Sequence, residues 1–257
     1  MPLHPAADPL VTRLLDLVFP PRCAGCGARG RVLCAGCLAL VRPPEALECA
    51  GCFQPLPPAT DGVAVGLCAR CRARGDVPLA GLRVAARYED PIRGAIRALK
   101  FQGQRRLAGP LGDLLAQMGG TTISEASLVV PVPLHATRER TRGYNQSRLL
   151  AQRYAARLGL PLRADLLARV RATPPQVGLT AQQRQANVAG AFATTHAASP
   201  ALGGRIIVLV DDVCTTGATL AAAAAALRAA GASAVWGLAV ARPTMQADSA
   251  ARAAAHA

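Results

Sequence analysis

Apolar runs of two kinds recur along the chain from residue 82 onward. Short, wholly apolar runs are typical of strands buried on both faces, whereas longer stretches with apolar residues at helical spacing predict helices packed on one side. The expected strands span residues 82–88, 127–132, 206–210 and 234–241, and the expected helices span residues 92–101, 107–118, 146–158 and 220–230. Strands that alternate with helices indicate an α/β domain with a parallel sheet, whose ligands bind at the carboxyl ends of the strands.

The residues before this domain follow a different pattern. A short apolar stripe predicts a lead-in helix over residues 10–19 that stops at Pro20 and Pro21, and residues 72–78 have the composition of a linker. We therefore expect a lead-in segment at residues 1–20, a small domain at residues 21–75, the α/β domain at residues 82–243 and a disordered tail at residues 244–257. No apolar stretch is long enough to predict a membrane span, and the first residues do not resemble a secretory signal, which favours a cytoplasmic protein.

Eight of the nine cysteines form four C-x-x-C pairs within the small domain. The pairs are Cys23 with Cys26, Cys34 with Cys37, Cys49 with Cys52, and Cys68 with Cys71. Two such pairs complete a tetrahedral four-thiolate zinc site, so the sequence predicts two zinc ions. Disulfides are the alternative, disfavoured in a reducing compartment. Ligation by sequential pairs, the first with the second and the third with the fourth, suits a double zinc ribbon, and a crossed arrangement is the open alternative.

These zinc sites are expected to be structural. A site with four cysteine ligands leaves no open position for water or substrate, and metal binding would supply much of the folding free energy of so small a segment. Replacing Cys23 by serine is expected to unfold the ribbon and to leave ligand binding by the α/β domain largely intact. The ninth cysteine, Cys214, has no histidine nearby in the sequence and is interpreted as a small filler.

An acidic pair followed by a threonine-rich turn carries most of the functional information. Asp211 and Asp212 come directly after the apolar run 206–210, and the turn that follows leads into the helix at 220–230. Backbone N–H groups at a helix start bind anions, and threonine hydroxyls add donors. The turn residues expected to cradle a phosphate are Thr215, Thr216, Gly217, Ala218 and Thr219. Because two carboxylates suit vicinal hydroxyls, a ribose 5-phosphate fits both parts.

A second polar segment follows the strand at 127–132. His135 stands where a pyrophosphate loop is expected, and Arg138, Arg140 and Arg142 concentrate three guanidinium groups just beyond it. Arginine suits bidentate contacts with pyrophosphate, and Gly143 would permit a mobile loop that closes over substrate. The alternative is a surface loop with a run of arginines, and His135 alone is a weaker candidate that would simply bond a backbone carbonyl.

Net charge and lysine usage refine this picture. The net charge is +14, of which residues 76–257 carry +11 with 21 basic and 10 acidic residues. Such an excess of positive charge indicates binding of nucleic acid or of a densely anionic substrate. The alternative explanation is a coding bias towards arginine, without a role in binding. Lys100 is the only lysine in the chain, which suggests a position where a compact ammonium was needed rather than a guanidinium.

The stretch from Val210 to Thr219 resembles the phosphoribosyl-pyrophosphate (PRPP) loop of type I phosphoribosyltransferases. Across residues 10–243 the chain resembles the ComF family of competence-related bacterial proteins. That resemblance is carried by the four cysteine pairs, the blocks Ala98-Leu99-Lys100-Phe101, Val130-Pro131-Val132-Pro133-Leu134, Arg142-Gly143-Tyr144-Asn145-Gln146, Thr173-Pro174-Pro175-Gln176 and Arg184-Gln185-Ala186-Asn187-Val188, and the PRPP loop. Tyr144 stands where we would expect phenylalanine.

The resemblance implies a phosphoribosyltransferase-like domain after a double zinc ribbon, in a protein linked to uptake or use of external DNA. Two functions of different class stay open. As an enzyme, the chain would use Asp211, Asp212, Arg142 and Lys100 in catalysis, and Mg2+ would bridge pyrophosphate to the ribose diol. The acceptor substrate is not identified. As a binding module, it would use PRPP or a nucleotide as a signal while it engages single-stranded DNA or a competence partner.

Overall fold

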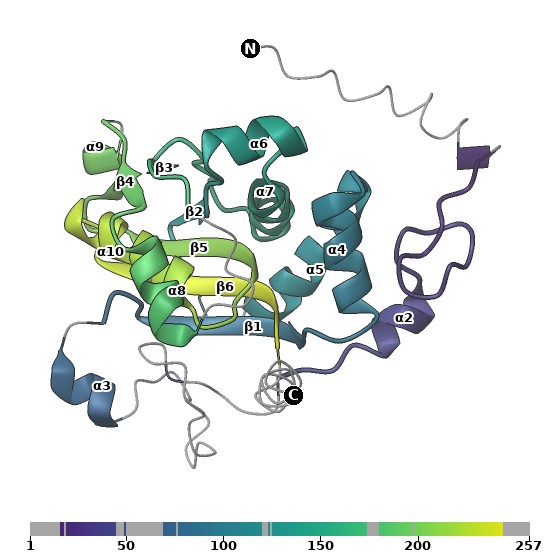
Figure 1. Ribbon diagram of the computed structural model, residues 1–257, viewed down its shortest axis with the longest axis horizontal. Coiled ribbons are helices and arrows are strands. Elements are labelled where there is room, and N and C mark those ends of the chain that lie inside the picture. The colour runs from purple at the N-terminus through teal and green to yellow at the C-terminus, as the bar shows by residue number, and fades with distance from the viewer. Residues whose placement is uncertain are drawn as a thin grey trace.

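The structure is a computed structural model of the 257-residue chain, and it describes residues 16–17, 19–44, 49, 69–75, 77–119, 123, 125–173, 180–196 and 198–243. Within these residues, a four-stranded parallel sheet forms the centre of the molecule (Figure 1). Its strands are β1 (Gly81–Arg87), β6 (Ala234–Arg242), β5 (Ile206–Val213) and β2 (Leu128–Pro131), in that spatial order. The predicted parallel α/β domain is confirmed.

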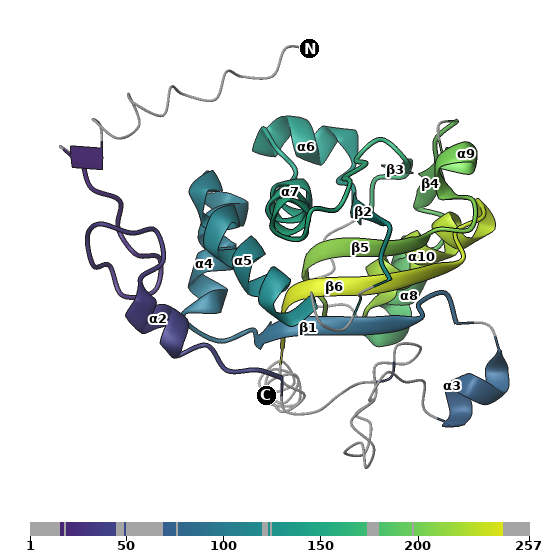
Figure 2. The same cartoon turned by 180° about the vertical axis from the view of Figure 1, so that it is seen from behind.

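Helices cover both faces of this sheet, as the two opposite views show (Figures 1 and 2). One face carries α5 (Ala108–Gly119) and α7 (Gln146–Leu158), with α4 (Ile92–Phe101) beside α5, and the other face carries α10 (Ala218–Ala229). The remaining described elements are α2 (Ala35–Ala39), α3 (Ala69–Arg74), η1 (Arg105–Leu107), α6 (Ala136–Arg142), β3 (Leu167–Arg169), α8 (Ala181–Val188), β4 (Phe192–Thr194) and α9 (Ala198–Leu202).

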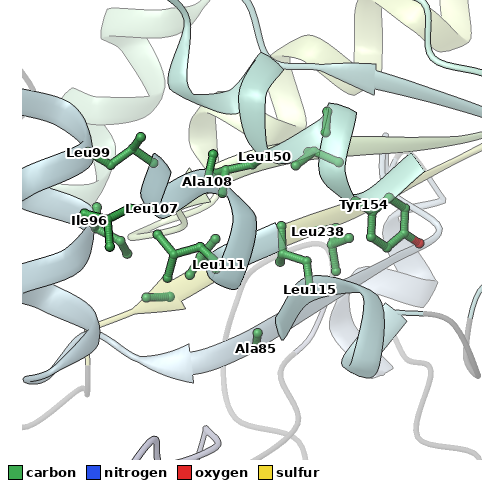
Figure 3. Packing of buried hydrophobic residues seen from close by; sticks show 14 of the residues in the cluster. Ala85, Ile96, Leu99, Leu107, Ala108, Leu111, Leu115, Leu150, Tyr154 and Leu238 are labelled. Carbon is green, nitrogen blue, oxygen red and sulfur yellow. The ribbon is translucent and has the colours of Figure 1, made fainter. Parts of the chain in front are cut away.

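The central strand β5 supplies two separate cores, because its side chains alternate between the faces of the sheet. Val208 and Val210 pack under α5 and α7, whereas Ile207 and Leu209 pack under α10, and all four are fully buried. Figure 3 shows the first core, in which leucines of α5 and Tyr154 of α7 meet the sheet. A strand buried on both faces explains why its sequence is apolar without alternation.

Several boundaries differ from those the sequence predicts. Strand β5 continues beyond Val210 to Val213, so the acidic pair lies within the last paired residues, with Asp211 opposite Ala239. The antiparallel pair β3–β4 and helix α8 were not predicted. Of the lead-in helix expected at residues 10–19, residues 16 and 17 are described as helical and most of the rest lies outside the described residues, as does the expected tail at 244–257.

The segment expected to form a mobile loop is instead helix α6. His135 caps its start with extended backbone, and Gly143 ends it with a left-handed conformation at φ 80°. This seven-residue helix has no buried residue, so it lacks the apolar stripe by which a helix is recognised in a sequence.

The first cysteine pairs do not form a separate body. Cys23 and Cys37 belong to the same buried cluster as Ala95, Ile96 and Leu99 of helix α4. Packing there is tight, because a Cβ atom added at Gly94 would lie 2.9 Å from the carbonyl oxygen of Ala24. The expectation that loss of Cys23 leaves the ligand site largely intact is therefore revised, since this segment and α4 share one core. Helix α2 lies near α4 in both ribbon views (Figures 1 and 2).

No helix among the described residues is both long and apolar enough to cross a bilayer.

Candidate functional site

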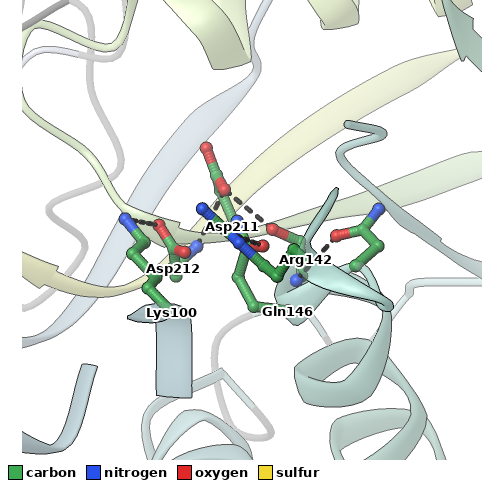
Figure 4. A network of polar contacts seen from close by, with 7 residues as sticks. Lys100, Arg142, Gln146, Asp211 and Asp212 are labelled. Atoms are coloured by element: carbon green, nitrogen blue, oxygen red, sulfur yellow. Dashed lines mark hydrogen bonds and ion pairs between the residues drawn. The ribbon is translucent and has the colours of Figure 1, made fainter. Parts of the chain in front are cut away.

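Two buried carboxylates at the end of β5 form the centre of the candidate site. Asp211 is 8 % exposed and Asp212 is 3 % exposed. One oxygen of Asp211, Oδ1, accepts hydrogen bonds from the Ser147 hydroxyl and from the Asp212 backbone N–H, each at 2.9 Å. Side chains from α4, α6 and α7 gather around this pair (Figure 4). The carboxyl end of a parallel strand is where the sequence placed the site.

Lys100 neutralises part of this charge. It lies in the last turn of α4, and its Nζ is 2.8 Å from Asp212 Oδ1. Burial lowers the pKa of Lys100, but the charge and hydrogen bond of Asp212 outweigh burial, so that pKa is raised overall and the ammonium is retained. A compact cation was expected at Lys100 because it is the only lysine of the chain, and the ammonium group provides that cation.

Asp211 has an unusual proton affinity. Burial raises its pKa to about 7, the neighbouring charge of Asp212 adds to this rise, and Lys100 opposes it. Asp211 therefore takes up a proton at a higher pH than an ordinary carboxyl group. Such a carboxyl, shifted by burial and a like charge, is common at binding and catalytic sites.

The threonine-rich turn follows the carboxylates directly. Gly217 precedes α10 in a left-handed conformation at φ 69°, which lets the chain enter the twelve-residue helix at once. The hydroxyl oxygen of Thr216 is buried and finds no partner among the residues that the structure describes. A buried hydroxyl without a partner beside a helix N-terminus is free to bind a ligand oxygen. Cys214, by contrast, is buried at 2 % exposure and burial raises the pKa of its thiol to about 12, which fits its interpretation as a filler.

The three arginines of α6 do not act as one group. Arg138 donates to the Thr173 carbonyl at 3.4 Å, and Arg140 donates to the Thr137 hydroxyl at 3.5 Å. Arg142 donates to the side chain of Gln146 and lies over the ring of Phe101. Arg140 lies two positions from each of the others and therefore points away from both, whereas Arg138 and Arg142 are four apart, lie on the same side of the helix and have different partners.

His135 also has a local role that differs from the expected bond to a carbonyl. Its Nδ1 accepts the Thr137 backbone N–H at 3.4 Å, which caps α6.

A pocket of about 340 Å³ lies beside α6. It is lined by His135, Thr137, Arg138, Thr141, Arg169, Ala172 and Thr173. Arg169 follows two leucines and an alanine at the end of β3, donates to the Thr173 hydroxyl, and keeps a buried Nε without a partner among the described residues. Burial and Arg138 lower the pKa of Arg169, whereas Asp211 raises it, which places this guanidinium within electrostatic reach of the carboxylates.

Sequence reasoning missed two residues here, Arg169 and Ser147. Both sit near blocks that the family resemblance had already singled out, since Arg169 precedes Thr173 by four residues and Ser147 follows Gln146. Attention to the polar residues at the borders of those blocks would have found them.

The first two cysteine pairs converge as sequential ligation requires. The Sγ atoms of Cys23, Cys26, Cys34 and Cys37 all lie within 4.8 Å of one another. The distances from Cys23 Sγ to Cys37 Sγ and from Cys26 Sγ to Cys34 Sγ are both 3.6 Å, close to the ~3.8 Å that separates thiolates on a tetrahedral zinc ion. The backbone N–H of Cys34 points at Cys23 Sγ at 3.3 Å, which suits a thiolate. These four residues fit zinc.

The second two pairs are described only in part. Cys49 and Cys71 are buried at 0 % and 4 % exposure, and Cys52 and Cys68 lie outside the described residues.

Comparisons with known proteins agree with this architecture. The model of the phosphoribosyl transferase domain family matches residues 145–248, and the model of the double zinc ribbon domain matches residues 14–72. Competence protein F of Haemophilus influenzae is 35 % identical over 163 residues, which cover 61 % of this chain and 71 % of that protein. The chain belongs to the ComF family. Another similar protein, the DNA utilization protein YhgH of Escherichia coli K12, is 35 % identical over 173 residues, covering 65 % of this ComF-family chain and 74 % of its own length.

Solved structures give weaker likenesses. Glutamine phosphoribosylpyrophosphate amidotransferase from B. subtilis is 25 % identical with a TM-score of 0.35, over 51 % of the ComF-family chain and 25 % of its own chain. The protein TT1426 from Thermus thermophilus is 22 % identical with a TM-score of 0.30, over 53 % and 83 % of the two chains.

We predict that Lys100→Met lowers the free energy of unfolding by about 3 kcal/mol, because it leaves the buried Asp212 carboxylate without its cation. Chemical denaturation measures this loss. Arg153→Met is the control, since it breaks a half-exposed ion pair with Asp113 and is expected to cost less than about 1 kcal/mol. Adding Asp212→Asn to Lys100→Met should recover much of the loss, and equal losses in Lys100→Met and Arg153→Met would contradict the prediction.

Proposed function

We propose that this protein binds PRPP together with Mg2+ and supports transfer of the phosphoribosyl group, in the service of DNA uptake or use. The observation that carries the proposal is a buried acidic pair directly followed by a helix-start turn with an unpartnered threonine hydroxyl, together with an arginine-lined pocket whose Arg169 is within electrostatic reach of Asp211. A sugar diol, a 5-phosphate and a pyrophosphate are the three groups that such surroundings suit. The relatives named for competence and for DNA utilization support the biological role.

Each part of PRPP is assigned to residues of this chain. Asp211 and Asp212 hold the ribose hydroxyls, and the N–H groups and hydroxyls of the turn at Thr215–Thr219 hold the 5-phosphate. The pyrophosphate lies in the pocket of Arg138 and Arg169. This last assignment keeps Arg138 of the three arginines expected from the sequence and adds Arg169, because these two line the pocket.

The acidic pair also fits a divalent cation. Asp212 Oδ2 is buried and has no partner among the described residues, so a carboxylate oxygen is available beside the sugar position. Oxygen ligands of this kind suit Mg2+, which neutralises charge on pyrophosphate when it is bound. Asp211 and Asp212 would hold it.

The chain itself contributes positioning and electrostatics to group transfer. When the bond between C1 of the ribose and pyrophosphate breaks, its electron pair leaves with pyrophosphate, and the guanidinium groups of Arg138 and Arg169 stabilise that charge. A nucleophilic acceptor supplies the electron pair for the new bond to C1 and gives up its proton. The carboxylates stabilise the positive charge that develops on the sugar. Fixed charges in a partly buried site are effective because they need no reorganisation during the reaction.

For the cysteine-rich part we propose two structural zinc ions. We also propose that the protein is cytoplasmic. The first is bound by Cys23, Cys26, Cys34 and Cys37, whose sulfur atoms are already gathered. The second is bound by Cys49, Cys52, Cys68 and Cys71, by analogy of spacing. The ribbon then spans residues 21–75 and the phosphoribosyltransferase-like domain spans residues 82–243.

The proposed ligand is tested by calorimetry with PRPP and Mg2+. Asp211→Asn should weaken binding by about 1.5–3 kcal/mol, because it removes a charge-assisted interaction with the ligand. Asp165→Asn is the matched control, since Asp165 is an exposed carboxylate paired with Arg163. Release of pyrophosphate from PRPP in a cell metabolite extract distinguishes an enzyme from a binding module. Equal affinity of the native protein, Asp211→Asn and Asp165→Asn for PRPP would refute the site.

Affinity for PRPP and Mg2+ should depend on pH through Asp211. Its pKa in the free protein is raised to about 7, so below that pH a cation must displace a proton and binding weakens as the pH falls, approaching tenfold per pH unit below about pH 6. Calorimetry in buffers of different ionisation enthalpy measures the released proton. Asp211→Asn should abolish this proton release, and a pH-independent affinity of the native protein between about pH 5.5 and 8 would contradict the assignment.

Metal content and stability together test the zinc sites. Elemental analysis should find about two zinc ions per chain, and Cys26→Ser should reduce this to about one. Because Cys23 and Cys37 share a core with α4, loss of the first zinc should also lower the melting temperature of the α/β domain. Cys214→Ala is the control and should leave the zinc content unchanged. Disulfides among the paired cysteines would overturn the prediction.

A further inference from the structure

Helix α4 lies between α5 and the described part of the cysteine-rich segment in both ribbon views (Figures 1 and 2). Its residues Ile92, Ile96 and Leu99 are buried, whereas Arg93 and Arg97 are exposed. A helix of only ten residues is marginal in water by itself and depends on the packing of its buried side. The position of α4 is therefore determined by the groups that it contacts at its two ends.

The first turn of α4 fits closely against the loop of the first cysteine pair. This pair belongs to the first cysteine cluster, which consists of Cys23, Cys26, Cys34 and Cys37. A Cβ atom added at Gly25 in this loop would lie 2.6 Å from Pro91 Cβ and 2.7 Å from Cys37 Sγ. On the helix, a Cβ atom added at Gly94 would lie 2.9 Å from the carbonyl oxygen of Ala24. Close-packed contacts of this kind transmit displacement, so a change at the sulfur atoms reaches the start of α4.

The last turn of α4 provides the cation of the ligand site. Lys100 Nζ is 2.8 Å from Asp212 Oδ1, and the Tyr144 hydroxyl donates to the backbone carbonyl of Leu99. Gly94 and Lys100 are six residues apart, about 9 Å along a helix. One helical element therefore joins the first cysteine cluster to the buried carboxylates.

Two further contacts attach the cysteine-rich segment to the surroundings of α4. Before the helix, at the end of β1, the Arg87 backbone N–H donates to the Arg42 carbonyl at 2.9 Å, and Arg87 Nε donates to the Pro43 carbonyl at 3.0 Å. Beyond the helix, the guanidinium group of Arg106 in η1 donates to both carboxylate oxygens of Asp16. The segment is thus attached before, along and after α4, and the helix does not move independently of it.

We propose that the metal of the first cysteine cluster positions Lys100 against Asp212, so that metal binding at the cluster and ligand binding at the carboxylates favour each other. The cluster is then a regulatory site, and its loss weakens the ligand site without touching the ligand. The inference rests on the proposed zinc ion at this cluster, but not on the identity of the ligand. Because coupling between two binding sites is reciprocal, breaking the ion pair of Lys100 also weakens metal binding.

Lys100 is the only lysine of the chain, which makes its amine a direct reporter of this coupling. Acetic anhydride acetylates the amine, and mass spectrometry of the peptide that contains Lys100 measures the rate. In the zinc-loaded protein the reaction should be slow, because the side chain is paired with Asp212 and only 21 % exposed. Cys26→Ser, which removes the first zinc ion, should speed acetylation about five- to hundredfold, the usual range for coupling between two sites. Removal of zinc from the native protein with a chelator should have the same effect, and an unchanged rate in both experiments overturns the proposal.

A core substitution separates coupling through α4 from a general loss of stability. Leu227→Ala is the matched control, because Leu227 is fully buried on α10 in the core on the opposite face of the sheet. It destabilises the fold by leaving a cavity on the face away from α4. A smaller rise in acetylation than after zinc removal supports the proposal. A rise equal to that after zinc removal overturns it, since global unfolding then accounts for the reaction.

The contact between the cluster and α4 is tested with a pair of helical glycines. Gly94→Ala presses on the carbonyl of Ala24, whereas Gly109→Ala in the first turn of α5 meets nothing within 4 Å. Alanine favours a helix over glycine at both positions, so a difference between the variants reports on the contact. In the zinc-loaded protein, Gly94→Ala should speed acetylation of Lys100 and loss of the first zinc ion to a chelator. Gly109→Ala should change neither rate, and equal behaviour of the two variants overturns the proposal.

The reverse direction uses zinc affinity as the measurement. Lys100→Met should lower the zinc affinity of the first cluster, identified as the site that Cys26→Ser removes. Arg97→Met, which replaces an exposed cation of the same helix, should leave this affinity unchanged. Equal zinc affinities of Lys100→Met and Arg97→Met overturn the coupling.

The remaining outcomes separate this inference from the proposed function. PRPP with Mg2+ should raise the zinc affinity of the first cluster, and PRPP that binds without this effect overturns the coupling but not the proposed function. Absence of PRPP binding overturns the proposed function, while acetylation of Lys100 still decides the coupling. A protein that contains no zinc overturns both the zinc sites and the coupling.

Discussion

The pairing of Lys100 with the carboxylates of β5 is the constraint on which the rest of the site depends. Two adjacent acids at the end of a fully buried strand are costly unless a cation and hydrogen bonds accompany them. Lys100 and Ser147 provide these partners, and they come from helices on the same face of the sheet. The positions of α4 and α7 are therefore determined by charge compensation as well as by apolar packing.

Charge compensation also connects the two parts of the protein. Helix α4 carries Lys100 at its last turn and packs against Cys23 and Cys37, so one ten-residue helix touches both the cysteine cluster and the acidic pair. A metal at the cysteine cluster would stabilise the helix that delivers the ammonium group. The ribbon of this chain is thus more than an appended module.

Features encoded locally could be predicted from the sequence. The run from Ile206 to Val210, the acidic pair and the turn are contiguous, so their order alone predicts a strand end with a ligand site. Lys100 stood out because the chain uses arginine elsewhere. The spacing of the cysteine pairs predicted four-thiolate sites but left the pairing open, and the structure brings the first pair together with the second. Features that depend on distant segments could not be predicted. Ser147 reaches Asp211 across 64 positions in the chain, and Arg169 enters the pocket only because β3 runs beside the start of α6.

Helix α6 was mistaken for a loop because capping by His135 and Gly143, rather than an apolar face, defines it. Composition does not reveal side-chain direction on a short polar helix, which is why Arg140 was grouped with Arg138 and Arg142 although it lies only two positions from each.

The shared core around α4 has a consequence for genetics. A strain with a substitution in the first cysteine cluster that fails to take up or use DNA does not show that the cluster touches a nucleic acid or a ligand. Because the cluster shares a buried core with α4, the helix that carries Lys100, the defect is equally expected from a displaced ammonium group, which is 2.8 Å from Asp212 in the native arrangement. Complementation by the separated halves of such a protein is not expected, since the first cysteine cluster shares its buried core with α4 of the α/β domain.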